Sequence, residues 1–100
     1  MEAPALARVQ SESGAQGVEV VVINLLPGLY TLEKWKTYWR RIGGGDEVLF
    51  AQDTGQRAAD AFHVMRLGTT VVVDREGLVT YRDSGATPYD ILRAEVDKAL

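Results

Sequence analysis

Cysteine is the residue whose absence restricts this chain most. None of its 100 residues is a cysteine. The chain itself therefore cannot form disulfide bonds, thiolate nucleophiles or zinc–thiolate sites. It also has only one histidine, His63, and neither a nearby serine nor a second set of ligands accompanies it. We therefore expect no catalytic role for His63, no metal and no cofactor.

Excess positive charge and long apolar runs are absent as well. The net charge of −3 and the isoelectric point near 5.0 argue against nucleic acid as the main partner, because phosphate binding needs a basic face. No apolar run approaches the roughly 20 residues that span a bilayer, and the first residues show no signal-peptide pattern. With 46% hydrophobic and 25% charged residues, the chain is expected to form a single globular domain over residues 1–100.

Stretches rich in β-branched residues predict the strands. Val18–Leu26 is almost entirely apolar, which is typical of a strand covered on both faces. Thr69–Val73 is similar, and a polar turn that ends at Gly77 joins it to a second run, Leu78–Tyr81. Because glycine readily adopts the positive φ of a tight turn, these two runs predict a β-hairpin. A shorter strand is expected at Val48–Ala51.

Four segments have apolar residues at helical spacing, namely residues 1–13, 31–42, 56–64 and 87–100. Thr31 is expected to cap the second helix, Asp53 or Thr54 the third, and Thr87, followed by Pro88, the fourth. The resulting order, α-β-α-β-α-β-β-α, predicts an α/β fold with a central mixed sheet flanked by helices. The final hairpin would form an antiparallel edge of that sheet.

Residues 59–81 resemble the second half of the extracytoplasmic thioredoxin-like proteins, the thiol–disulfide oxidoreductases of the redoxin and cytochrome-maturation type. The family pattern is a helix ending in an aromatic residue and valine, a loop, Pro-Thr-Thr, an apolar strand, Asp-x-x-Gly and a second strand. The corresponding residues here are Phe62-His63-Val64, Gly68-Thr69-Thr70, Val71–Val73, Asp74–Gly77 and Leu78–Tyr81. Near the start, Glu2-Ala3-Pro4-Ala5-Leu6 is similar to the Glu-x-Pro-x-Leu that follows the family's Cys-x-x-Cys on the same helix.

The resemblance implies a thioredoxin-like fold and a protein thiol or disulfide as partner. It also implies a substrate groove lined by the backbone of Leu67, Gly68 and Thr69, in which Gly68 replaces the family's cis-proline. We expect Gly68 to lie in an accessible turn that tolerates a Gly68→Pro change. The chain begins just after the position of Cys-x-x-Cys, so the domain is expected to be incomplete at its N-terminus. Without an attacking thiolate and a resolving thiol, no residue is catalytic and the chain as given is expected to be inactive.

In the resembling family, the strand that leads into Cys-x-x-Cys lies between the counterparts of Val18–Asn24 and Thr69–Val73. Its absence would leave each of these strands with one unpaired edge. We therefore expect direct closure of the two strands or a strand from another chain between them, and a tendency to self-associate through these edges. The family resemblance implies an extracytoplasmic or membrane-anchored protein, whereas a chain that is the whole product would be cytoplasmic.

Two other functions stay open at this point. One is a redox-inactive thioredoxin-fold module that binds a protein partner. The other is an aspartic protease-like protomer, because Asp53-Thr54-Gly55 follows an apolar strand and two copies of Asp53 could share a proton. The helix-rich pattern argues against the protease, and Asp-x-Gly between a strand and a helix is more simply a turn and cap. Similarly, Trp35 and Trp39 are better explained as core residues than as a stacking platform.

Overall fold

Helices and strands alternate along the chain in the expected order. The computed structural model describes residues 3–64, 68–85 and 87–100. Its main elements are α1 (Ala3–Ser13), β1 (Val21–Asn24), α2 (Leu32–Arg41), β2 (Leu49–Gln52), α3 (Arg57–Ala61), β3 (Thr70–Val73), β4 (Val79–Asp83) and α4 (Tyr89–Ala99). The third helix is shorter than the predicted segment 56–64. None of the helices in these described residues is long and apolar enough to cross a membrane.

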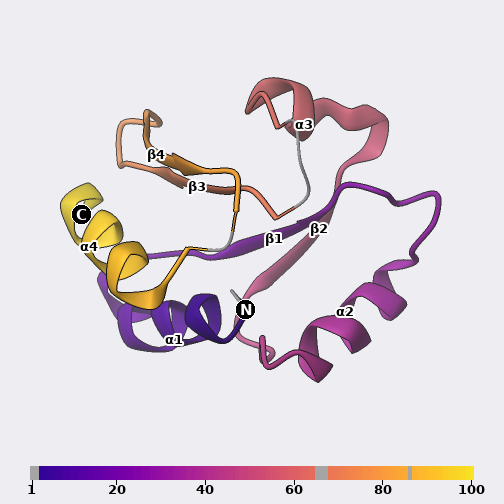
Figure 1. Cartoon of the computed structure of the whole chain (residues 1–100), viewed down its shortest axis with the longest axis horizontal. Coiled ribbons are helices and arrows are strands. Elements are labelled where there is room, and N and C mark those ends of the chain that lie inside the picture. Colours follow the sequence, from indigo (N-terminus) through magenta and orange to yellow (C-terminus); the bar gives the residue numbers. More distant parts are fainter. Residues whose placement is uncertain (1–2, 65–67, 86) are drawn as a thin grey trace.

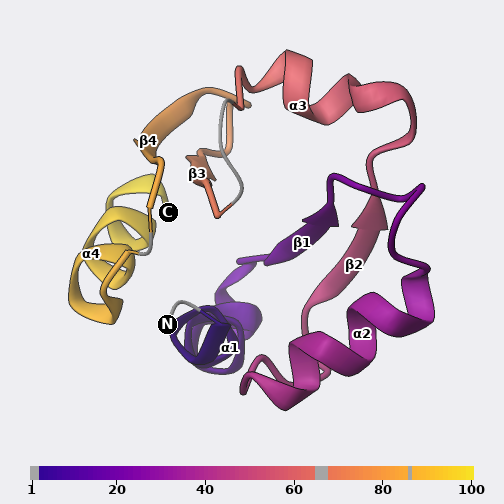
Figure 2. The same ribbon diagram turned by 45° about the vertical axis from the view of Figure 1, so that its right-hand side comes forward.

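The strands form two separate two-stranded sheets, so the expected single central sheet is wrong. β1 and β2 run parallel, with Val21 opposite Leu49, and β3 and β4 run antiparallel, with Val72 opposite Tyr81. Figures 1 and 2 show the strands in the order β4, β3, β1, β2 across the molecule. Within the described residues, no ladder joins β3 to β1. Apolar patterning predicts where a strand forms, but it does not decide whether two strands come close enough to pair.

The division of the sheet also changes how the strands are buried. In β1, Val22 and Asn24 are buried, whereas the side chain of Val21 is 48% exposed. In β3, Val72 is buried and Val73 is 44% exposed. The expectation that these strands are covered on both faces is therefore wrong. Each strand has one valine in the buried apolar core and another that is largely exposed.

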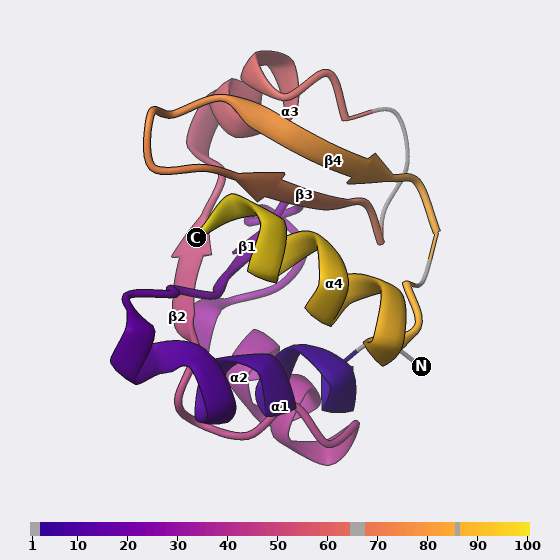
Figure 3. The same ribbon diagram turned by 90° about the vertical axis from the view of Figure 1, so that its left-hand side faces the viewer.

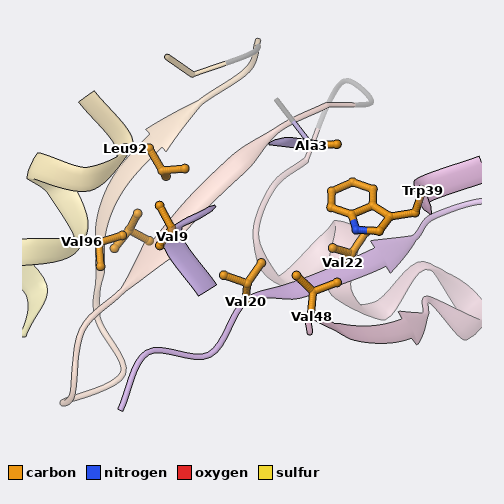
Figure 4. Packing of buried hydrophobic residues seen from close by; sticks show 9 residues of the cluster. Ala3, Val9, Val20, Val22, Trp39, Val48, Leu92 and Val96 are labelled. Carbon is orange, nitrogen blue, oxygen red and sulfur yellow. The ribbon is translucent and has the colours of Figure 1, made fainter. Parts of the chain in front are cut away.

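One apolar cluster joins the two sheets to the helices. Figure 4 shows its buried members, which are Ala3, Val9, Val20, Val22, Trp39, Val48, Val72, Leu92 and Val96. Trp35 is partly buried against this cluster, so the interpretation of both tryptophans as core residues is confirmed. The radius of gyration of 13.0 Å equals the value of about 13 Å expected for 100 residues, so the divided sheet does not expand the fold.

The predicted N-cap at Thr31 is confirmed, whereas the predicted N-cap at Thr87 is wrong. The hydroxyl of Thr31 accepts a hydrogen bond of 3.2 Å from the backbone N–H of Lys34, as expected for an N-cap. Thr87 does not take the same role, because its hydroxyl donates to a carboxylate oxygen of Asp83 at 3.1 Å. Helix α4 instead begins one residue after Pro88 and has no side-chain cap.

A cluster of charged and aromatic side chains holds α1 against α4. The carboxylate of Glu12 accepts hydrogen bonds from the Arg8 Nε and an Arg93 guanidinium nitrogen, each at 3.1 Å, and from the hydroxyl of Tyr89. The Arg8 guanidinium lies 3.9 Å from the centre of the Tyr89 ring. The hydrogen bond from Tyr89, together with the two arginines, lowers the pKa of Glu12 below its ordinary value of 4.5. The ionised carboxylate is therefore the form that stabilises the α1–α4 contact.

We predict that Glu12→Gln reduces the loss of stability that occurs as the pH is lowered. The pKa of Glu12 is lower in the folded chain than in the unfolded chain, so its contribution to the free energy of unfolding is fully present above the pKa of the unfolded chain. This contribution is lost as the pH falls through the pKa of the folded chain. Urea midpoints measured from neutral pH down to about pH 3 are expected to fall less for the variant than for the parent chain. Glu76→Gln, in the exposed β3–β4 turn, is the matched control. Parallel curves for the Glu12 variant and the parent would contradict the prediction.

We also predict that Gly44→Ala destabilises the fold by about 1–3 kcal/mol, the usual cost of overpacking a core. Gly44 is buried, and a Cβ built on it would lie only 2.0 Å from the indole nitrogen of Trp39. Gly28→Ala is the control, since no heavy atom lies within 4 Å of the corresponding Cβ position. Chemical unfolding of both variants measures the difference. Equal stabilities would mean that the Trp39 ring moves aside at no cost.

Candidate binding site between the two sheets

Strand β1 pairs with another strand along only one of its edges in the described part of the chain. Leu49 N–H donates to the carbonyl of Val20, and Asp53 N–H donates to that of Asn24, both at 2.9 Å. Successive residues of a strand direct their peptide groups to opposite sides, so Val21 and Ile23 direct theirs away from β2 and toward β3. Among the described residues, no strand pairs with this edge.

Strand β3 also pairs along only one of its edges among the described residues. Its hairpin with β4 closes through a 2.9 Å hydrogen bond from Asp74 N–H to the carbonyl of Leu78, with Gly77 at a positive φ of 83°. The Asp74 carboxylate accepts from the N–H groups of Glu76 and Leu78, which fixes the turn. β4 is the only strand that pairs with β3 in the described part of the chain. In the described part of the chain, neither the second edge of β1 nor that of β3 forms a ladder with another strand.

The three residues predicted to line a groove lie directly before β3. Leu67 is outside the described residues. Gly68 is exposed and has a φ of +87°, and Thr69 is half-buried. Figure 3 shows that the start of β3 and the N-terminal ends of α1 and α4 lie at the same end of the molecule. Gly68 and Thr69 directly precede β3, so they lie at the same end of the molecule as the start of α1.

Asp53 caps a helix, and His63 lies exposed after α3. Asp53 is 5% exposed, and its two carboxylate oxygens accept hydrogen bonds from the N–H groups of Ala58 (2.7 Å) and Ala59 (3.0 Å). This geometry agrees with a turn and cap, and it occupies both oxygens that a catalytic carboxylate pair would need. His63 is exposed at the end of α3 with a φ of +54°. In residues 3–64, 68–85 and 87–100, no group of His, Asp and Glu is placed to hold a metal ion.

A shallow groove between α2 and β2 was not foreseen from the sequence. It measures about 370 Å³ and is lined by Lys36, Arg40, Asp46, Val48, Leu49 and Phe50. Its two cations already have neighbours: Arg40 Nε lies 2.5 Å from the Asp46 carboxylate, and Lys36 Nζ lies 5.6 Å from the centre of the Phe50 ring. The hydrogen bond that Arg40 donates to the Asp46 carboxylate also raises the pKa of Arg40. Lys36 and Arg40 are four residues apart, so the sequence alone places them on one face of α2. That this face lies against β2 depends on the packing of the two elements.

We predict that Gly68→Pro disrupts this site, contrary to the tolerance expected from the sequence. A proline ring fixes φ near −65°, which is incompatible with the observed +87°. Gly68→Asn should cost much less, about 1–2 kcal/mol, because asparagine tolerates left-handed backbone and no heavy atom lies near the added Cβ. Unfolding curves of the two variants test this. A proline variant as stable as the asparagine variant would contradict it.

No family model matches the chain, and no curated protein sequence matches it.

Proposed function

We propose that this chain is a thioredoxin-like domain of the thiol–disulfide oxidoreductase type, which recognises a protein partner but has no thiol chemistry within its own 100 residues. The proposal combines the resemblance of the sequence with the arrangement of the elements. The observation that carries it is the division of the strands into β2–β1 and β3–β4, with β3 beside β1 and no ladder between them among the described residues. In the resembling family, the strand that leads into the redox cysteines occupies the corresponding position.

The position of the helices supports the same proposal. Helix α1 packs on α4, and α4 packs on both β3 and β4. The N-terminal end of α1 lies at the same end of the molecule as the start of β3 (Figure 3). In the resembling family, the redox cysteines lie at the start of the helix that corresponds to α1, where the partially positive N-terminus lowers the pKa of a thiol. The turn at Gly68 and Thr69 would then contact the backbone of the partner.

A redox-inactive binding module is the second candidate, and the lack of cysteine favours it. The two candidates share the thioredoxin-like fold and the substrate groove expected at residues 67–69. They differ in whether the domain can lower the pKa of a thiol at the start of α1. The protease alternative has less support, because the Asp53 carboxylate already caps α3.

The test adds two cysteines to the N-terminus of the chain. We predict that the unaltered chain leaves the reduction of a protein disulfide by dithiothreitol at the uncatalysed rate. An extended variant carries an apolar strand of about eight residues and the sequence Trp-Cys-Gly-Pro-Cys before residue 1. This variant is expected to react about tenfold faster than the same extension as a free peptide, because a pKa near 7 raises the thiolate fraction by about that factor.

The matched control carries serine in place of both added cysteines. It is expected to fold like the active variant and to leave the uncatalysed rate unchanged. A folded extended variant that is no faster than the free peptide would contradict the oxidoreductase type and favour the redox-inactive module.

A further inference from the structure

We propose that the groove between α2 and β2 binds an extended acidic segment of another protein, which adds as a further strand to the outer edge of β2. Side chains of both elements line this groove, and α2 packs on β2. The inference goes beyond the proposed function, because it involves neither a thiol nor residues 67–69.

The groove follows the edge of β2. Three consecutive residues at the start of the strand, Val48, Leu49 and Phe50, line it on one side, and Lys36 and Arg40 of α2 line it on the other. Successive side chains of an extended chain point to opposite faces of the sheet, so a groove that touches all three residues runs along the edge of the strand. A strand added at this edge would therefore pass between β2 and α2.

The backbone of β2 offers hydrogen-bonding groups along this edge. The N–H groups of Leu49 and Asp53 donate to carbonyl groups on the β1 side. Because alternate residues of a strand direct their peptide groups to the same side, those of Phe50 and Gln52 point away from β1. In the described part of the chain, β1 is the only strand that pairs with β2. A chain that adds to such an edge gains affinity from its backbone and specificity from alternate side chains.

The charges around the groove define the partner as acidic. Although the chain has a net charge of −3, α2 contains four basic residues and one acidic residue. In the groove, the Asp46 carboxylate lies 2.5 Å from Arg40 Nε and balances its charge. Lys36 forms no ion pair among the described residues, and its Nζ lies 5.6 Å from the centre of the Phe50 ring. A carboxylate on the added strand would supply the opposite charge at Lys36.

The two faces of β2 define the pattern of side chains on the added segment. Phe50 lies on the same face as the Lys36 ammonium, so the side chains that the segment directs to this face are expected to be acidic. Leu49 points to the opposite face, and 53% of its surface is exposed. Apolar, β-branched side chains such as valine suit that face. The segment is therefore expected to alternate acidic and apolar residues.

A second copy of this chain does not fit the same edge. Pairing of two β2 edges would bring two α2 helices close together, and each helix has three more basic than acidic residues. Like charges at close range oppose such a contact. The sequence of β2, Leu-Phe-Ala-Gln, also has no acidic residue to place beside Lys36. The occupant is therefore a segment of a different protein.

Synthetic peptides provide the test. The probe is an eight-residue peptide of alternating glutamate and valine with blocked ends, and the control peptide has lysine at each glutamate position. We expect the probe to bind one-to-one in an NMR titration and to slow hydrogen exchange at Phe50 and Gln52. The lysine peptide is expected to bind at least about tenfold more weakly, because it places a like charge beside Lys36.

N-methylated peptides test whether the probe binds as a strand. One carries N-methyl groups at all valines and the other at all glutamates, so each lacks the donors along one of its edges. At least one of the two is expected to bind at least about tenfold more weakly than the probe, because the edge that faces β2 then has no N–H groups to donate.

Two charge reversals in α2 locate the site on the protein. Lys36→Glu removes the unpaired cation of the groove and is expected to weaken binding of the probe at least about tenfold. Lys34→Glu makes the same change in net charge at an exposed position that does not line the groove. It is expected to weaken binding at most about twofold, because salt screens exposed charges outside the contact. If Lys36→Glu does not fold, hydrogen exchange at Phe50 and Gln52 in the parent chain still decides the result.

Five outcomes would overturn the inference. The first two are a probe that does not bind saturably and a lysine peptide that binds equally well. Equal weakening by the two charge reversals would mean that only the overall charge of α2 attracts the peptide, and full binding of both N-methylated peptides would mean that only side chains adhere. A dimer in sedimentation that excludes the probe would assign the edge to a second copy. An inactive cysteine-bearing variant would leave this inference standing and would contradict only the oxidoreductase type.

Discussion

The hydrogen-bonding capacity of the strand backbone is the constraint on which the rest of this structure depends. A buried peptide group needs a partner, and a strand satisfies that need on two edges. Strands β1 and β3 pair on one edge each, and their other edges face one another across the middle of the molecule. This arrangement explains why valines in strands that look like central strands are partly exposed.

The two sheets are held in place by the helices and by the shared core, because no ladder in the described residues links them. Helix α2 packs on β2, α4 packs on β3 and β4, and α1 packs on α4. Two local contacts make these positions specific. The Glu12 carboxylate gathers Arg8, Tyr89 and Arg93 between α1 and α4, and Gly44 leaves room for the indole of Trp39.

The residues with the most suggestive chemistry in the sequence have ordinary structural roles. Asp53 resembles a catalytic aspartate in its local motif, yet its two oxygens cap a short helix. His63 is exposed at a helix end, and no ligand group surrounds it among the described residues. The candidate site consists instead of backbone, namely the edges of β1 and β3 and the turn at Gly68.

The sequence by itself determined the order of the elements, the positions of the strands, the turn at Gly77 and the N-cap at Thr31. These features follow from side-chain periodicity and from the φ preferences of single residues, which act over a few positions along the chain. Only the tertiary structure decided that the sheet is divided, that Gly68 has a φ of +87° and that the Thr87 hydroxyl pairs with Asp83 instead of capping α4. It also decided that Lys36 and Arg40 line a groove against β2. These features depend on which elements approach each other, because a strand edge or a hydroxyl pairs with whatever neighbour packing brings to it, and apolar periodicity is the same whether that neighbour is present or absent.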